Sequence, residues 1–150
     1  KKRTNNFKVV IAGSGTIANK DLLEKDDSYI IINRYITNEE IVALNKAAKI
    51  IVCPYLSVSQ SGLIPTSFVF EKPIIASNIG AFKETLIDGY NGLFVDTGSP
   101  EDLAEKIFKL LNDETLYLRL SENIKNFGKS EEYGWVSIAN KTFNTYFDSH

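Results

Sequence analysis

The sequence is poor in the residues that build metal centres and nucleophilic active sites. Among its 150 residues there is one histidine, which is the last residue, and one cysteine, Cys53. A Ser/His/Asp triad, a Cys/His pair and a histidine metal site are therefore close to excluded within this chain, and we predict no metal. A single cysteine forms no internal disulfide, which fits a reducing cytoplasm, and the apolar residues around Cys53 favour a packing role.

The sequence also lacks a strong charge bias and long apolar runs. Its 17 basic and 19 acidic residues are interspersed and give a formal net charge of -2, so we predict no nucleic-acid partner. The apolar runs are too short to cross a bilayer and no signal-peptide pattern precedes the first predicted strand, so we expect a soluble, cytoplasmic protein. A hydrophobic content of 43% in 150 residues suffices for one core, and we predict one domain over residues 1–150.

The segment 59–77 couples a turn of small residues to a short helix and then to a buried strand. Ser59, Gln60, Ser61 and Gly62 follow the apolar run 49–54, so a strand ends here and a helix begins. The first backbone N–H groups of a helix lack partners within it and, with the positive end of the helix dipole, suit a pyrophosphate. The segment predicts a phosphate-binding loop, although Ser and Gly also begin many helices that bind nothing.

Short β-branched runs alternate with amphipathic segments along the whole sequence. Strands are expected at 7–11, 29–32, 49–55, 74–76 and 92–95, and helices at 17–23, 38–48, 63–71, 82–87, 100–111, 116–127 and from 134 onward. Thr37 with Glu40 and Ser99 with Asp102 have the spacing of capping boxes. This alternation predicts an α/β, Rossmann-like fold, a three-layer sandwich with a mainly parallel sheet and ligands outside the carboxyl ends of its strands.

Several short motifs follow one another in a characteristic order. They are Val9-Val10-Ile11-Ala12-Gly13-Ser14-Gly15, residues 32–40 (INRYITNEE), 72–77 (KPIIAS), 80–84 (GAFKE), 88–95 (DGYNGLFV) and 99–104 (SPEDLA). Taken together they resemble the C-terminal, donor-binding domain of group 1 glycosyltransferases, which are retaining, nucleotide-sugar enzymes of GT-B architecture. The resemblance covers nearly the whole chain, and it implies a domain that binds a nucleoside-diphosphate sugar without a further cofactor.

The phosphate loop departs from the usual form of this family. That form has a pair of glutamates, one contacting the donor sugar or phosphate and the other the ribose, and Val58 and Thr66 stand at these positions. Gln60, Ser61 and Thr66 are the local candidates to replace them. The Gln-Ser-Gly sequence resembles a variant found among enzymes of bacterial surface-polysaccharide assembly, which implies a glycan or lipid-linked acceptor.

The resemblance implies roles for residues in separate segments. The expected donor site comprises Gln60, Ser61, Gly62 and Leu63 at the diphosphate, Thr66 on the ribose side, Arg34, Tyr35 and Ile36 on the base side, and Gly13, Ser14 and Glu84 near the donor sugar. On the base side, either Arg34 or Tyr35 stacks on the base, or both are plain surface residues. The glycines alternatively only shape a turn, and Glu84 alternatively only matches a helix dipole.

The resemblance also implies that the chain is part of a larger enzyme. The family's donor domain begins with a further strand and helix that carry an Arg and a Lys, and a separate N-terminal domain binds the acceptor, so we expect both to lie outside this sequence. The fragment alone is then inactive, and the full-length enzyme is compatible with peripheral attachment to the inner face of a membrane. Two alternatives stay open: half of a sugar-nucleotide 2-epimerase, and a non-catalytic Rossmann-like module that binds a nucleotide or a protein.

Overall fold

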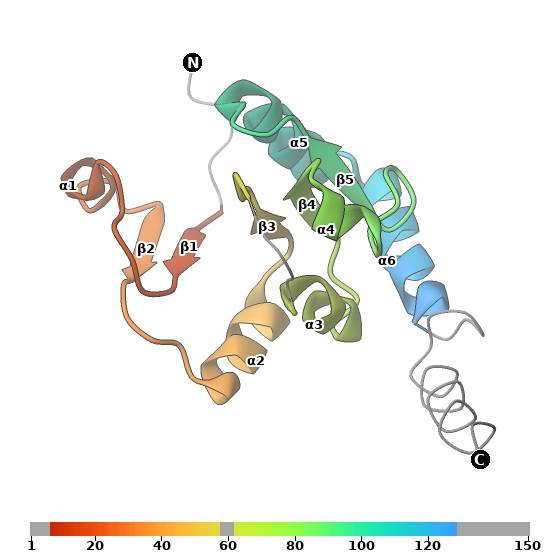
Figure 1. Cartoon of the computed structure of the whole chain (residues 1–150), viewed down its shortest axis with the longest axis horizontal. Helices are drawn as coiled ribbons and strands as arrows, with labels where there is room; N and C mark the ends of the chain where they lie inside the picture. The colour runs from red at the N-terminus through yellow and green to blue at the C-terminus, as the bar shows by residue number, and fades with distance from the viewer. Residues whose placement is uncertain (1–6, 58–61, 129–150) are drawn as a thin grey trace, which may run out of the picture. The chain divides into compact units, whose positions relative to one another are not determined.

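The computed structural model of the chain describes residues 7–57 and 62–128, and the chain divides into two compact units. The first unit ends at Leu44 and the second begins at Asn45. Each contains a parallel sheet and is considered by itself (Figure 1). The helix expected from residue 134 lies outside the described residues, and the single domain over residues 1–150 stays a prediction.

The first unit is a strand-helix-strand motif that leads into a longer helix. β1 (Val9–Ala12) and β2 (Tyr29–Ile32) pair in parallel, and α1 (Lys20–Leu23) lies on the connection between them. Parallel neighbours need such a crossover because the chain must return to the same end of the sheet. The predicted strand 29–32 is confirmed, whereas the first strand begins and ends later than the predicted 7–11.

α1 is shorter than the helix expected over 17–23. Asn19 precedes it in the left-handed region, with φ 54° and ψ 31°, and the Asn19 side chain makes no capping hydrogen bond. Leu22 is 65% exposed, so the apolar spacing of this segment does not correspond to a buried face. Because short helices depend on caps and packing, little more than one turn is helical.

α2 (Asn38–Ala47) begins at the capping box that the sequence predicts. Thr37 Oγ1 accepts the N–H of Glu40 at 3.3 Å, and Glu40 Oε2 accepts the N–H of Thr37 at 3.0 Å. These bonds satisfy N–H groups that have no partner in the first turn of a helix. The sequence therefore places this helix start correctly.

The second unit contains a parallel sheet in the order β3-β4-β5. β3 (Ile51–Cys53) pairs with β4 (Ile74–Ser77), which pairs in turn with β5 (Gly92–Val95). Every residue of β4 is buried, as expected for the central strand of a parallel sheet covered on both faces. The strands predicted at 74–76 and 92–95 are confirmed, and β3 is shorter than the predicted 49–55.

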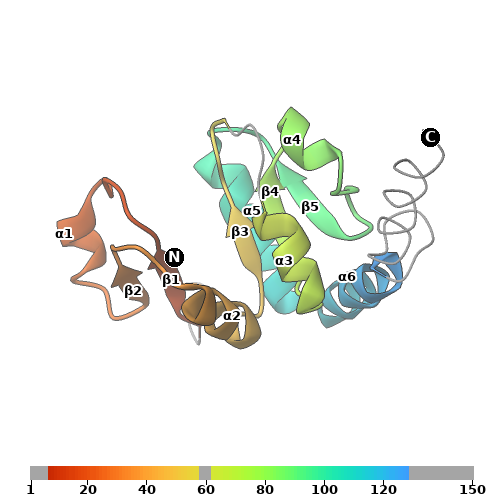
Figure 2. The ribbon, with the colours of Figure 1, turned by 60° about the horizontal axis from the view of Figure 1, so that its bottom comes forward.

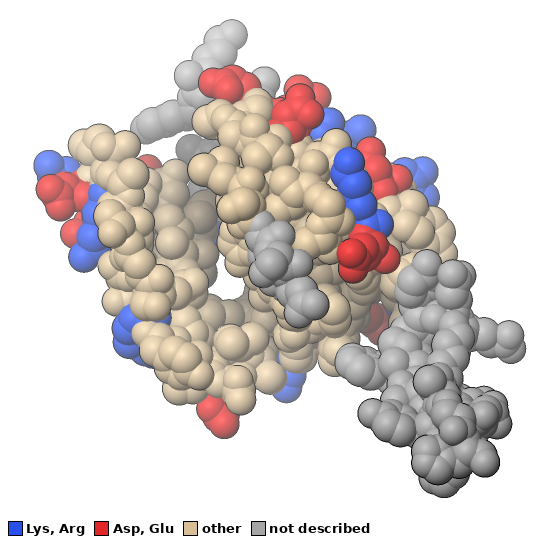
Figure 3. Space-filling model, in the orientation of Figure 1, with Lys and Arg blue, Asp and Glu red and all other residues tan. Residues whose placement is uncertain are grey.

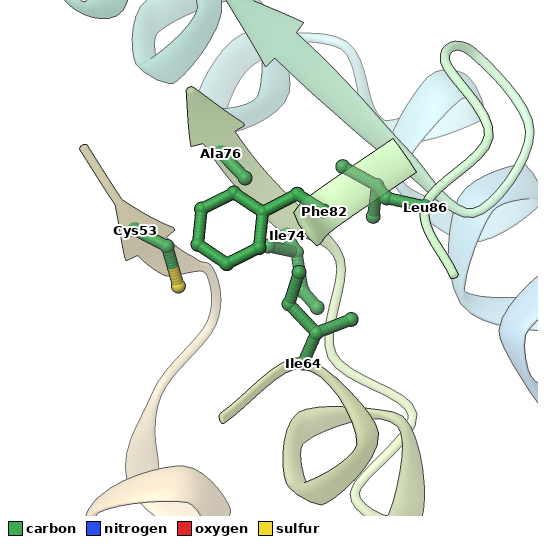
Figure 4. Packing of buried hydrophobic residues seen from close by; sticks show 6 residues of the cluster. All are labelled: Cys53, Ile64, Ile74, Ala76, Phe82 and Leu86. Carbon is green, nitrogen blue, oxygen red and sulfur yellow. The ribbon is translucent and has the colours of Figure 1, made fainter. Parts of the chain in front are cut away.

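Helices cover both faces of this sheet (Figures 1 and 2). The residues of β4 alternate between the two faces. On one face, α3 (Leu63–Val69) and α4 (Gly80–Lys83) contribute to a cluster of Cys53, Ile64, Ile74, Ala76, Phe82 and Leu86 (Figure 4). On the other face, α5 (Pro100–Asn112) and α6 (Glu114–Phe127) contribute to a cluster of Ile75, Leu93, Val95, Leu110, Leu116 and Leu120. Successive strand residues point to opposite faces, which explains why Ile74 and Ile75 belong to different clusters. The predicted α/β fold with parallel strands is confirmed, and the three-layer arrangement is seen in this unit, although the described strands of the chain form two sheets.

The segment between α4 and β5 is a turn organised by a buried asparagine. Asn91 is 0% exposed; its Oδ1 accepts the N–H of Ile87 at 2.7 Å and its Nδ2 donates to the carbonyl of Thr85 at 3.1 Å. Asp88 Oδ1 accepts the N–H of Phe94 at 2.8 Å. Because side-chain groups replace helical partners here, the helix predicted over 82–87 is wrong in extent.

The start of α5 follows the prediction only in part. Ser99 Oγ accepts the N–H of Asp102 at 3.2 Å, and Pro100 is the first helical residue, where its missing N–H is harmless. The Asp102 carboxylate, however, accepts the N–H of Asp96 at 2.8 Å, while the N–H of Ser99 donates to the carbonyl of Asp96. The reciprocal half of the capping box is therefore wrong, because the preceding turn competes for the same groups.

Candidate functional site

The carboxyl ends of β3, β4 and β5 lie at one edge of the sheet in the second unit. Ligands bind at this edge in open α/β sheets because the loops that follow the strands converge there. A pocket of about 190 Å³ opens at this edge beside the start of α5, and its lining consists of Pro54, Ser77, Val95, Asp96, Gly98, Ser99, Pro100 and Leu103. Sequence reasoning missed these residues, although Ser77 ends β4 and Asp96 directly follows β5.

The predicted phosphate loop leads into α3. Gln60 and Ser61 lie outside the described residues, Gly62 is the N-cap residue and Leu63 is the first residue of the helix. Gly62 is exposed, with φ -72° and ψ -8°, and a Cβ added to it would meet no atom within 4 Å. Glycine brings no side chain to cap the helix start, so a ligand has close access to the backbone at this residue.

Thr66 and Glu84 are further candidates for the donor site in the second unit. The Thr66 hydroxyl donates to the carbonyl of Gly62 at 2.7 Å, so toward a ligand its oxygen serves as an acceptor. Glu84 is exposed and is the C-cap residue of α4. The alternative in which Glu84 matches a helix dipole is therefore wrong, because the carboxyl end of a helix carries the negative end of the dipole.

Tyr55 is a further residue at this edge that sequence reasoning missed. It follows β3, is 40% exposed, and its ring centroid lies 5.8 Å from that of Phe82 in the core. Partial burial raises the pKa of the Tyr55 phenol above its ordinary value, with a smaller contribution from Cys53. Its only sequence signal was its place directly after the predicted apolar strand.

In the first unit, the glycine turn that follows β1 is bonded to the end of β2. The N–H of Gly13 donates to the carbonyl of Ile32 at 3.1 Å, and the N–H of Gly15 donates to Oδ1 of Asn33 at 3.1 Å. Gly13 has φ 140°, a conformation that residues with a side chain rarely adopt, and Ser14 is exposed. The turn role predicted for this segment is thus visible, and Ser14 faces solvent.

Arg34, one of the predicted base-side residues, is held by its own chain. Its Nη1 donates to Oε2 of Glu40 at 2.8 Å and to the carbonyl of Tyr35 at 2.9 Å, and its Nη2 pairs with Oε1 of Glu40. The hydrogen bonds from Arg34 and from the Thr37 N–H lower the pKa of Glu40 to about 2, and the same pair raises the pKa of Arg34. Tyr35 is 77% exposed, and Ile36 is half-buried.

The face of the molecule drawn in Figure 3 carries no strongly charged patch. On the side drawn in Figure 3, basic and acidic side chains alternate without a large patch of one sign. Within residues 7–57 and 62–128, no three His, Cys, Asp or Glu side chains gather in a way that would hold a metal ion. In the same part of the chain, none of the helices has both the length and the apolar character needed to span a membrane.

The fold and the position of the loops define a Rossmann-like α/β protein of the kind found in GT-B glycosyltransferases. The family model described as "Glycosyl transferases group 1" matches residues 1–113. The chain therefore belongs to the group 1 glycosyl transferases, and the resemblance inferred from its motifs is confirmed at the level of the family.

Several known proteins are similar to this chain. An uncharacterized glycosyltransferase of Methanocaldococcus jannaschii is 32% identical over 133 residues, which are 87% of this chain and 37% of the relative. HepE of Anabaena, solved in complex with UDP, superposes with a TM-score of 0.77 at 16% identity over 95% of this chain and 41% of its own. The C-terminal domain of the group 1 protein LpcC from Francisella tularensis superposes with a TM-score of 0.71 at 22% identity, over 85% of this chain and 70% of that domain's chain. The chain thus spans little more than a third of the curated relative.

Proposed function

We propose that this chain is the donor-binding part of a retaining glycosyltransferase that transfers a sugar from a nucleoside-diphosphate sugar to a glycan or lipid-linked acceptor. The observation that carries the proposal is the start of α3, where Gly62 is exposed and leaves the backbone open to a ligand. Membership of the group 1 family and the fold shared with the UDP complex of HepE support it. The acceptor domain of the same enzyme is the partner that would complete the site.

The proposed chemistry depends on charge that grows on the departing diphosphate. Backbone N–H groups held at a helix start stabilise such charge without having to reorganise during the reaction. We assign this role to Gly62 and Leu63, assisted by Gln60 and Ser61, with Thr66 on the ribose side. Ser14 and Glu84, which are both exposed, are assigned to hydroxyl groups of the donor sugar. No step in this scheme needs a metal or a further cofactor.

The subfamily and the location follow from the same proposal. The Gln-Ser-Gly loop supports an acceptor that belongs to bacterial surface-polysaccharide assembly. An enzyme that acts on such an acceptor is expected to be cytoplasmic and to work at the inner face of the membrane. The match to the group 1 glycosyl transferase family model favours the glycosyltransferase over the epimerase alternative. A nucleotide-binding measurement separates the donor domain from a module that binds only proteins.

Calorimetry with the purified chain tests the proposal. Titrations with UDP, GDP, ADP, CDP and inorganic pyrophosphate should give heat with at least one nucleotide. Gly62→Val should weaken that binding by about tenfold or more, because it blocks backbone approach and each hydrogen bond to a charged group is worth about 1.5–3 kcal/mol. The matched control is Gly128→Val, since a Cβ at Gly128 meets only ordinary contacts, the nearest at 3.6 Å from the carbonyl of Ile124. Equal affinity of Gly62→Val and the wild type would show that the phosphates bind elsewhere.

A further inference from the structure

The pocket beside the start of α5 lies on the face of the second unit's sheet that α5 and α6 cover. Val95 belongs to the cluster on that face, and Leu103 packs against it. Ser77 follows Ala76 of the opposite cluster, and because successive strand residues alternate, its side chain points to the same face as Val95. The start of α3 packs against the other cluster through Ile64. The pocket and the proposed phosphate loop therefore lie on opposite faces of the sheet.

Ser77 brings a buried hydroxyl group to this pocket. The residue is 1% exposed, and its hydroxyl forms no hydrogen bond with any residue in the part of the chain that the structure describes. Buried hydroxyl groups are nearly always paired, because a buried polar group without a partner is costly. An unpaired hydroxyl that lines a pocket indicates a partner that comes from outside the chain.

Asp96 supplies the charged group of the pocket. It is exposed, and its carboxylate forms neither a hydrogen bond nor an ion pair with another described residue. The carboxylate of Asp102, in contrast, accepts the N–H of Asp96 at 2.8 Å and pairs with Lys106 at 3.5 Å. Ser99 Oγ accepts the N–H of Asp102 and can still donate its own hydrogen. The pocket thus offers a free carboxylate and two hydroxyl groups, and none of its described lining residues is basic.

The remaining side chains of the pocket give it an apolar surface. They are Pro54, Val95, Pro100 and Leu103. Leu56, which is 73% exposed, extends this surface, because its Cδ2 would lie 3.8 Å from a Cβ added to Gly98. The volume of about 190 Å³ is far more than one water molecule needs, yet it is below the range of about 300–1,000 Å³ that is usual for drug-sized ligands. The pocket therefore fits one small group that combines an apolar surface with hydrogen-bonding atoms.

We propose that this pocket binds a neutral, polyhydroxylated ring of the size of one sugar residue through the Ser77 hydroxyl and the Asp96 carboxylate. Ring hydroxyls donate to Asp96, and they both donate to and accept from Ser77, while the C–H surface of the ring packs against Pro54 and Leu103. An anion is disfavoured by Asp96 and by the two acidic residues in the first turn of α5. An ammonium group would lose hydration against the apolar lining and gain only one carboxylate in return.

This inference goes beyond the proposed function and does not depend on it, since the pocket contacts neither a phosphate nor a base. Heteronuclear NMR of the isotope-labelled chain tests it, because this method detects weak binding and locates it. In titrations with the methyl glycosides of glucose, galactose, mannose and N-acetylglucosamine, at least one should shift the backbone amide signals of Ser77, Asp96 and Gly98. Ethanolamine and inorganic phosphate, the cationic and anionic probes, should leave these signals unchanged. If no glycoside shifts them, or if either charged probe does, the inference is overturned.

Two substitutions test the hydrogen bonds that the proposal assigns. Ser77→Ala should weaken the best-bound glycoside by about two- to tenfold, and Asp96→Asn by about tenfold or more, because hydrogen bonds to charged groups are stronger. Ser121→Ala is the control for the first, since Ser121 Oγ is also buried without a partner but lies in α6, outside the described lining. Glu101→Gln is the control for the second, because it removes a charge from the same helix start. Both controls should bind as the wild type does, and wild-type affinity in Ser77→Ala and Asp96→Asn would refute the assignment.

Unfolding by urea separates a ligand-binding role of Ser77 from a structural one. Ser77→Ala removes a hydroxyl that has no partner within the described chain, so the unfolding midpoint should stay the same or rise. A clearly lower midpoint would show that this hydroxyl supports the fold, and the inference would fall. Both Ser77→Ala and Asp96→Asn should keep the wild-type affinity for the best-bound nucleotide, and its loss together with the glycoside would contradict a separate pocket. The glycoside result stands whether or not the chain binds a nucleotide.

Discussion

The buried side chain of Asn91 allows a sharp test of how the second unit is held together. In Asn91→Ala, the N–H of Ile87 loses its acceptor at 2.7 Å and the carbonyl of Thr85 loses its donor at 3.1 Å. A buried polar group left without a partner costs about 1–3 kcal/mol. Both partners are only partly buried, so water can reach them in part and the lower half of that range applies to each. We therefore expect Asn91→Ala to lower the free energy of unfolding by about 2–4 kcal/mol, which is about 1–2 kcal/mol for each of the two groups.

Urea unfolding followed by far-ultraviolet circular dichroism measures this loss. The midpoint should fall while the slope stays constant, which shows that stability has changed and not the surface exposed on unfolding. Asn112→Ala is a matched control: Asn112 Nδ2 also donates to a carbonyl, that of Phe108 at 2.7 Å, but at an exposed site. Its substitution should change stability by less than about 1 kcal/mol. If Asn91→Ala is as mild as Asn112→Ala, the turn is not held by this side chain and our account of it is wrong.

Three further predictions use other parts of the same unit. Gly92→Ala should destabilise the chain by about 1–3 kcal/mol, because the added Cβ would lie 2.5 Å from Leu86 Cδ1 and 2.7 Å from the carbonyl oxygen of Ile74. Urea unfolding measures this loss, and an unchanged stability would mean that β4 and β5 separate easily. Glu71→Gly should instead raise the free energy of unfolding by about 0.5–1 kcal/mol, since Glu71 has φ 55° and glycine removes that strain. A lower urea midpoint than that of the wild type would contradict this. Burial raises the pKa of Cys53 to about 12, so the native thiol should resist a thiol reagent at pH 8 and react on unfolding. Because the folded state favours the neutral thiol, its contribution to stability is complete below pH 9 and is lost as the pH rises toward 12. Fast labelling of Cys53 in the native chain would refute its burial.

The elements predicted best are those whose signals are local. The start of α2 at Thr37, the cap of α5 by Ser99 and the limits of β5 all agree with the sequence. Capping residues and the change of hydrophobic period act within a few positions, so the chain itself carries the information. The extents of α1 and α4 were predicted wrongly, because the length of a short helix depends on what covers it.

The candidate site divides in a similar way. Sequence motifs brought out the glycine turn, the loop before α3 and the loop before α2, and the family model agrees with the protein class that these motifs imply. The pocket beside Ser77 was not predicted, because it is formed by the ends of strands that lie far apart in the sequence. Nor did sequence spacing indicate that the Asn33 amide would bond to Gly15, eighteen positions away.

The amino-acid sequence by itself determined the order of strands and helices, the starts of α2 and α5, and the family, because each of these depends on short-range patterns of side-chain size, polarity and hydrogen-bonding capacity. Only the tertiary structure decided which groups remain available to a ligand. Arg34 and Tyr35 are neighbours in sequence and looked interchangeable as base contacts, yet the terminal nitrogens of Arg34 pair with Glu40, six positions further on, while Tyr35 is 77% exposed. The reason is physical: a side chain's role depends on which partners the folded backbone brings within hydrogen-bonding distance, and local spacing does not specify those partners.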